Sequence, residues 1–530
     1  PGKAVQGHLI EAPGSLPWDL DMPSTAFEEA LHGFSWLDDL AAQGDSHARG
    51  IAQKWVWSWI DRYGAGIGPG WTPDLTGRRL IRWINHAVFL LRGRSAEDSR
   101  RFFQSLGQQT IFLSRRWRSA TPGLPRFEAL SGLVYAGLAL TGLERLAVPA
   151  VAALGKECEA QIDGQGGIAS RNPEHLLEVF SLLVWAAQAL EDADQTPSVA
   201  HRNALERMAP TLRAIRHGDS GLARYHGGGA GPEGRLDGTL AQARVRKVLE
   251  QDKLAMGFAR LAGGRVTVIA DAARPPVGIG AGNAHASTLS IEMTSGRRPV
   301  LVNCGSGADF GEDWHRTGRS TANHSTLCLD GKSSSDFGKS ELEVSGREYL
   351  VVAPADVQAR MSRVDDGHKV LMGHNGYVTK YGLTHTRSLH MTFNGSQLTG
   401  EDSLAAISEA DQRTFGQEMT RRNMQGIPFD IRFHLHPDVN ASLDMGGQSI
   451  SLKAKSGEIW LFRFDGDVEL TLEPSVYLEQ TRLKPRATQQ IVLTGRIVEF
   501  TRRIGWTLAK APGTSDAVRD LEDADPYLDF

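Results

Sequence analysis

A tyrosine and a histidine stand side by side in the glycine-rich segment GLARYHGGG, residues 221–229. Phenol and imidazole side chains are common general acids and bases, and neighbouring glycines would let such a loop close over a ligand. Tyr225 and His226 are therefore the preferred proton-transfer pair, and Arg224 beside them is a candidate contact for a substrate carboxylate. The alternative is a surface loop that carries an incidental histidine.

A further candidate base lies in IASRNPEHLLEVF, residues 168–180. Asn172 before Pro173 predicts a helix start, with asparagine as the N-cap and proline at the first helical position. His175 then falls in the first turn, where the helix dipole lowers the pKa of a histidine and favours the neutral imidazole that a base requires. His175 is thus a catalytic candidate, and Asn172 serves either as the cap alone or also as a substrate contact.

Three basic residues, Arg78, Arg82 and His86, recur every four residues on one predicted helix and so share a face. Such a stripe suits an anionic glycan, although an ordinary solvated helix face has the same pattern. Trp71, in the loop GIGPGWTPDLTG, is a candidate exposed platform for stacking against a sugar ring. These four residues are predicted to bind substrate.

The bulk properties narrow the class of protein. A chain of 530 residues exceeds what one hydrophobic core usually serves, so two domains are expected. The formal net charge of −4 argues against nucleic acid as the main partner. No apolar run reaches the roughly 20 residues that span a bilayer, and no signal peptide is visible at the start of the chain.

The hydrophobic period divides the chain into two halves. Up to about residue 245, apolar residues recur at helical spacing, as in RRLIRWINHAVFLLRG and EHLLEVFSLLVWAAQALEDA. Beyond that point they alternate with polar residues, as in FDIRFHLHPDV and SISLKAKSGEIWLFRFDG. We therefore expect an (α/α) toroid over residues 1–245 and an antiparallel β-sandwich over residues 246–530, with the glycine-rich segment where the domains meet.

Three motifs resemble the heparinase II/III-like polysaccharide lyases: NAHASTLSIEMTSGRRPVLVNCGSG, RTGRSTANHSTLCLDGKSSS and YGLTHTRSLHMTFNGSQLTGEDSL. The resemblance covers nearly the whole chain. It implies a helical toroid packed on a β-sandwich, an acidic polysaccharide bound between them, and β-elimination at a uronic acid. It also implies that no cofactor is required and favours a periplasmic or secreted location.

The resemblance places further residues in the site. Asn283 stands where many family members have a catalytic histidine. A structural divalent metal, zinc or calcium, found in some members would be held here by His285, Asn303 and His324, although the two histidines would otherwise hydrogen-bond to neighbouring loops. In LPRFEALSGL, Arg126 and Glu128 occupy a helix start that in the family often bears the group neutralising the uronate. Arg126 could do so by a bidentate contact.

The leading prediction is a polysaccharide lyase that cleaves a uronate-containing acidic polysaccharide. The first alternative is a glycan-binding protein on the same fold that does not cleave its ligand. The second is a glycoside hydrolase, which would need two carboxylates across the cleft, and Glu128 with Glu174 is the pair nominated for it. The sugar identity and the oligomeric state stay open.

Overall fold

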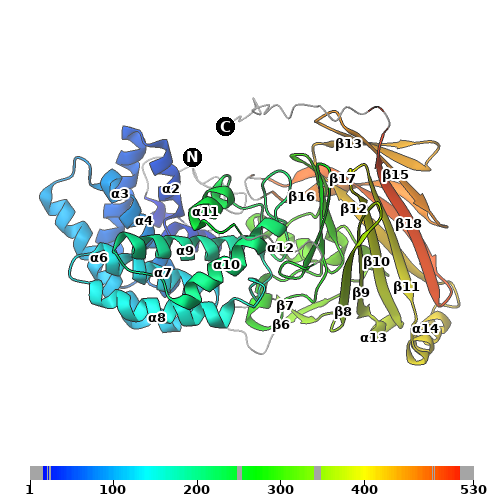
Figure 1. Ribbon diagram of the computed structural model, residues 1–530, viewed down its shortest axis with the longest axis horizontal. Helices are drawn as coiled ribbons and strands as arrows, with labels where there is room; N and C mark the ends of the chain where they lie inside the picture. The colour runs from blue at the N-terminus through cyan, green and yellow to red at the C-terminus, as the bar shows by residue number, and fades with distance from the viewer. Residues whose placement is uncertain are drawn as a thin grey trace.

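The computed structural model describes residues 16–20, 22, 25–246, 253–339, 348–479, 482, 484–511 and 513. The helices of the N-terminal half lie together on one side of the molecule (Figure 1). Their bounds are α1 (Thr25–His32), α2 (Ser35–Gln43), α3 (Ser46–Tyr63), α4 (Pro73–Asn85), α5 (Ala87–Leu91), α6 (Ala96–Arg116), α7 (Leu124–Ala139), α8 (Glu144–Gln161), α9 (Pro173–Asp192), α10 (Val199–Ala214) and α11 (Arg235–Ala243).

Helix α7 lies at the centre of this half and packs against α4, α8 and α9. Gly77 of α4 and Gly132 of α7 face each other so closely that a Cβ on either residue would collide with the other helix. The N-terminal part of the core is aromatic, with Trp59, Trp83 and Phe102 fully buried. The expected (α/α) toroid is confirmed.

The C-terminal half is built from antiparallel strands (Figure 1). It also contains the helices α12 (Glu312–Gly318), α13 (Val378–Tyr381) and α14 (Glu409–Arg421). The strands are β1 (Phe258–Gly263), β2 (Val266–Asp271), β3 (Ile291–Ser295), β4 (Arg298–Val302), β5 (Leu327–Leu329), β6 (Asp336–Lys339), β7 (Glu348–Val352), β8 (Val357–Val364), β9 (Gly367–Tyr377), β10 (Leu383–Thr392), β11 (Gln397–Ala405), β12 (Ile427–Leu435), β13 (Val439–Asp444), β14 (Ser449–Ala454), β15 (Ile459–Asp465), β16 (Glu469–Tyr477), β17 (Arg486–Ile497) and β18 (Thr501–Lys510).

Two large sheets form the expected β-sandwich. One has the strand order β1-β2-β3-β4-β12-β17-β16, with β5 also paired to β12, and the other has the order β13-β14-β15-β18-β11-β10-β9-β8. Burial alternates residue by residue along β10, as it should for a strand with one face on a core. Phe433 and Trp506 meet in that core with ring centroids 4.7 Å apart.

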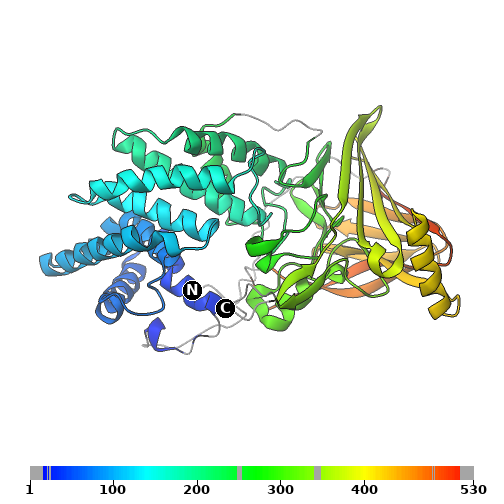
Figure 2. The same cartoon turned by 90° about the horizontal axis from the view of Figure 1, so that it is seen from below.

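The two halves meet at the first strands of the sandwich, as Figure 2 shows from a second direction. Helix α11 ends at Ala243 and β1 begins at Phe258. The predicted boundary between residues 245 and 246 lies in this interval, part of which is outside the described residues. In the part of the chain that the structure describes, no helix combines the length and the apolar character that crossing a membrane requires.

Candidate functional site

A cleft of about 1470 Å³ lies between the helical domain and the sandwich. Its helical wall comes from the start of α4, the end of α6 and the starts of α7 and α9. Its other wall comes from residues 277–283, from α12 and from Arg319 and Glu348. Of the residues predicted from the sequence, the cleft is lined by Trp71, Arg78, His175, His226 and Asn283.

His175 lies in the first turn of α9, as the sequence predicted. The Asn172 side chain caps this helix by accepting hydrogen bonds from the backbone N–H groups of Glu174 and His175, at 2.9 and 3.1 Å. Burial lowers the pKa of His175 to about 4, and the nearby Arg78 lowers it further while Glu178 opposes the shift. The imidazole is therefore neutral at pH 7 and can accept a proton from a ligand in the cleft.

Arg319 lies on the opposite wall and is a site residue that the sequence analysis missed. Its Nε donates to the Ala284 carbonyl at 2.9 Å and its Nη1 to the Glu348 carbonyl at 2.8 Å. Its Nη2 is buried and has no hydrogen-bond partner among the residues that the structure describes. Burial lowers the pKa of Arg319 to about 10, so the guanidinium is still a cation at pH 7. This arrangement leaves one N–H₂ group of a fixed arginine in the cleft wall without a hydrogen-bond acceptor among the described residues.

Trp71, predicted from the sequence to be an exposed platform, lines the cleft as a partly exposed ring. Its indole N–H donates to the Tyr63 carbonyl at 2.7 Å. The fully buried Arg79 donates to the Gly70 carbonyl at 3.0 Å and lies 4.1 Å from the Trp59 ring centroid. These contacts fix the loop that presents Trp71, so the ring is held in place in the cleft wall.

Tyr225 does not reach the cleft. It is fully buried, and its hydroxyl lies 3.1 Å from the carbonyl oxygens of both Ile269 and Ser290. The glycines beside it permit close packing rather than loop closure, since a Cβ on Gly228 would collide with the Asn172 side chain. The predicted tyrosine–histidine pair therefore does not act as a unit on a bound sugar.

His226 lines the cleft but directs both ring nitrogens into the protein. Nδ1 accepts the backbone N–H of His285 at 3.2 Å, which places the proton of the neutral ring on Nε2, 3.6 Å from the Asp271 carboxylate. Burial lowers the pKa of His226 to about 3, although Asp271 opposes the shift. His226 therefore lines the cleft, but neither of its ring nitrogens is placed to transfer a proton to or from a ligand in the cleft.

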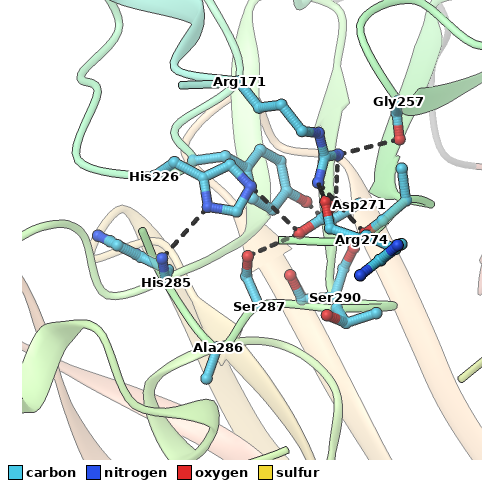
Figure 3. A network of polar contacts seen from close by, with 12 residues as sticks. Arg171, His226, Gly257, Asp271, Arg274, His285, Ala286, Ser287 and Ser290 are labelled. Carbon is cyan, nitrogen blue, oxygen red and sulfur yellow. Dashed lines mark hydrogen bonds and ion pairs between the residues drawn. The ribbon is translucent and has the colours of Figure 1, made fainter. Parts of the chain in front are cut away.

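The Asp271 carboxylate contacts side chains from both domains (Figure 3). It accepts from the Arg171 Nη2 at 2.6 Å and from the Ser287 hydroxyl at 2.7 Å. Arg171 also donates to the backbone carbonyls of residues 256, 257, 273 and 274, so all its N–H donors are used. Both Arg171 and His226 have left-handed backbones, with φ of 48° and 50°. This buried network joins the domains directly behind the cleft wall.

The three predicted metal ligands do not converge on one point. His285 and His324 hydrogen-bond to each other, and the Asn303 side-chain amide binds elsewhere. The His324 Nδ1 donates to the Ser320 carbonyl at 2.7 Å, and its Nε2 lies 3.0 Å from the His285 Nδ1. The Asn303 side-chain oxygen accepts the Ser325 backbone N–H at 3.0 Å. Among the residues described, no group of three or more His, Cys, Asp or Glu side chains could hold a metal ion. Two imidazoles fall short of the four ligands of structural zinc, and calcium prefers oxygen ligands.

Arg126 and Glu128 lie behind the helical wall instead of in the cleft. Arg126 donates to the Ala120 carbonyl at 2.8 Å and lies 3.6 Å from the Glu157 carboxylate. Glu128 is buried and accepts from Arg78 at 2.9 Å. The uronate-neutralising role predicted for Arg126 is thus not supported, because its guanidinium is committed to the protein.

The remaining predicted substrate contacts also bind the protein itself. Arg82 and His86 both contact the Asp38 carboxylate at 2.9 Å and do not line the cleft, so these two residues of the basic stripe bind the protein itself. Arg224 lies 3.6 Å from the buried Glu292 carboxylate and does not line the cleft. Asn172 donates to the His226 carbonyl at 3.1 Å in addition to capping α9. Its role is to join the helix to the glycine-rich segment.

A helical toroid, an antiparallel sandwich and a cleft between them define the architecture of this protein. A family model described as heparinase II/III-like, C-terminal, matches residues 251–507. The chain is 30% identical to FtsZ-localized protein C from Caulobacter vibrioides, over 96% of this chain and 88% of that protein. The chain belongs to the heparinase II/III-like family.

Solved structures agree on the fold. The crystal structure of heparinase III matches with a TM-score of 0.71 and 13% identity, over 96% of this chain and 81% of that one. The heparan sulfate lyase HepC from Pedobacter heparinus matches with a TM-score of 0.60 and 14% identity, over 94% of this chain and 79% of that one. At such low identity these structures support the architecture alone.

Proposed function

We propose that this protein is a polysaccharide lyase that binds a uronate-containing acidic polysaccharide in the interdomain cleft and cleaves it by β-elimination. One observation carries the proposal. The same cleft is lined by a fixed arginine with an unpartnered N–H₂ group, Arg319, and by a neutral histidine, His175. These are the two kinds of group that elimination at a uronate requires, and family membership supports the same reaction.

In the proposed reaction, the Arg319 Nη2 binds the uronate carboxylate and stabilises the negative charge that develops when the C5 proton leaves. His175 accepts that proton and becomes an imidazolium. The C4–O bond then breaks as the C4–C5 double bond forms, and the imidazolium returns its proton to the departing oxygen. A histidine whose pKa is lowered to about 4 is a strong acid once protonated, which suits this second step. The products are a 4,5-unsaturated uronate and a shorter chain.

A glycan-binding protein that does not cleave its ligand is the second candidate. It is favoured by the burial of the Tyr225 phenol and by the engaged nitrogens of His226, since neither is then available for proton transfer. Within the described residues no tyrosine lines the cleft. The curated relative is also named for its localisation with FtsZ and not for a reaction.

The hydrolase alternative has less support. Burial raises the pKa of Glu128, as suits a general acid, but this carboxylate is paired with Arg78 and does not line the cleft. Glu174 accepts the Gly229 backbone N–H at 2.8 Å. Neither carboxylate is thus presented to a glycosidic bond.

One assay separates the three candidates. The protein is incubated with a panel of uronate polymers while the ultraviolet absorbance of the 4,5-unsaturated product and the appearance of reducing ends are both followed. Lyase activity gives both signals in equal amounts, and hydrolysis gives reducing ends alone. Retarded migration of the protein in a glycan-containing gel without any product identifies the non-cleaving binder and overturns the lyase proposal. The periplasmic or secreted location stays a prediction, tested by fractionating cells that express the tagged protein.

A further inference from the structure

Three arginines lie close together in the chain beside the cleft, where α6 ends and the short 3-10 turn Trp117–Ser119 follows. Arg115, Arg116 and Arg118 are all exposed, and Arg116 lines the cleft together with Ser119 and Ala120. No ion pair joins any of the three to an acidic side chain in the ranges that the structure describes. Two arginines earlier in the same helix are paired, Arg100 with Glu97 and Arg101 with Asp61. The cluster therefore presents several uncompensated cations beside the site.

The backbone that carries these arginines is fixed. The buried side of the segment is held by Arg126, which donates to the Ala120 carbonyl at 2.8 Å and to the Arg118 carbonyl at 3.4 Å. The Ser119 hydroxyl donates to the Arg116 carbonyl at 2.8 Å. Trp117 packs against the helical core, and the Arg118 guanidinium lies 4.4 Å from its ring centroid. Only the guanidinium ends remain available to a ligand.

A simpler explanation covers part of this cluster. Basic residues in the last turn of a helix interact favourably with the negative end of its dipole, which accounts for Arg115 and Arg116 at the end of α6. It does not account for Arg118, which lies beyond the helix and is stacked on Trp117. It also does not explain why the cluster borders the cleft. In the chain, Trp117 and Arg118 lie between the cleft residues Arg116 and Ser119.

We propose that Arg116 and Arg118, presented by Trp117, form an outer subsite that binds a second anionic group of the polysaccharide, beyond the sugar whose carboxylate Arg319 binds. The inference rests on the proposed function and narrows its substrate class. The ligand is a polymer that is charged at repeated intervals, because a glycan with a single uronate would leave this subsite empty. Arg126 is a positioning residue for the subsite.

Heparin fragments of two lengths test the subsite, since their uronates alternate with sulfated sugars. Calorimetric titration compares a disaccharide, which can occupy only one of the two positions, with an octasaccharide. Each charge-assisted contact corresponds to about a tenfold change in affinity or more. The wild-type protein should therefore bind the octasaccharide at least about tenfold more tightly than the disaccharide. The double variant Arg116→Gln/Arg118→Gln should lose that preference without weaker disaccharide binding.

The control variant Arg413→Gln/Arg503→Gln removes two exposed arginines from the sandwich and should keep the length preference. Unchanged thermal unfolding shows that both variants are folded. If the Arg116/Arg118 variant keeps the octasaccharide preference, the subsite is refuted while the proposed function stands. If the wild-type protein binds both fragments with equal affinity or binds neither, the subsite is refuted. The proposed function is refuted only if no polymer of the panel yields the unsaturated product.

Discussion

The Arg171 guanidinium and the Asp271 carboxylate form a buried ion pair of 2.6 Å that joins the loop before α9 to the end of β2. Burial alone would raise the pKa of Asp271, but Arg171 and the nearby His226 hold it below its usual value. The carboxylate is thus ionised in the folded protein, and it is the point at which both domains are tied behind the cleft (Figure 3).

Replacing Asp271 with Asn should cost about 3–5 kcal/mol in the free energy of unfolding, because the Arg171 cation then remains buried without its partner. Chemical denaturation measures this loss. The matched variant Asp467→Asn, whose side chain is fully exposed, should unfold like the wild type. An equal free energy of unfolding in Asp271→Asn and the wild type would show that the ion pair does not stabilise the contact between the domains.

Acidification should destabilise the fold between pH 6.5 and pH 4. Burial lowers the pKa of His201 to about 4, whereas in the unfolded chain it titrates near 6.5. The unfolded state therefore binds a proton in this window that the folded state does not, and unfolding becomes more favourable as the pH falls. For His201 the effect is on the order of 3 kcal/mol. The melting temperature should fall from pH 7 to pH 5, and it should fall less steeply in His201→Gln. An equal fall in the melting temperature of both proteins would show that His201 does not cause the acid destabilisation.

The rate of elimination should not change at the pH where an ordinary histidine titrates. Because burial lowers the pKa of His175 to about 4, the base is already neutral at pH 5 and above. A profile of kcat/KM against pH should therefore be flat from pH 5 to pH 8, after correction for the unfolded fraction. An acid limb centred near pH 6.5 would contradict the environment described for His175.

Metal removal should leave the protein unchanged. His285 and His324 hydrogen-bond to each other at 3.0 Å, and Asn303 is engaged by the Ser325 backbone. We therefore predict that the purified protein contains substoichiometric zinc and calcium by elemental analysis and that a chelator does not alter its melting temperature. One equivalent of bound metal, with a lower melting temperature after its removal, would restore the metal site implied by the family resemblance.

Local patterns in the sequence predicted the fold and one part of the site. The period of the apolar residues distinguished toroid from sandwich, and Asn172 with Pro173 correctly located the start of α9 and hence His175. Tyr225 was misjudged because glycines that favour a mobile loop serve here for close packing against Asn172 and Asn283. Arg319 was missed because its other guanidinium nitrogens donate to the backbone carbonyls of residues 284 and 348. These residues are distant from Arg319 in the sequence, so local patterns could not show which of its N–H groups lacks an acceptor.

The most direct test of the account is the initial rate of unsaturated product formation from the preferred uronate polymer by the wild type, Arg319→Gln and His175→Gln. Loss of a group that stabilises charge in the transition state typically lowers kcat by about 10²–10³-fold. We predict a decrease of that size in Arg319→Gln and a comparable decrease in His175→Gln. The control Arg413→Gln should keep the wild-type rate. Wild-type rates in both cleft variants, or no unsaturated product from any polymer with the wild-type protein, would contradict the proposed elimination.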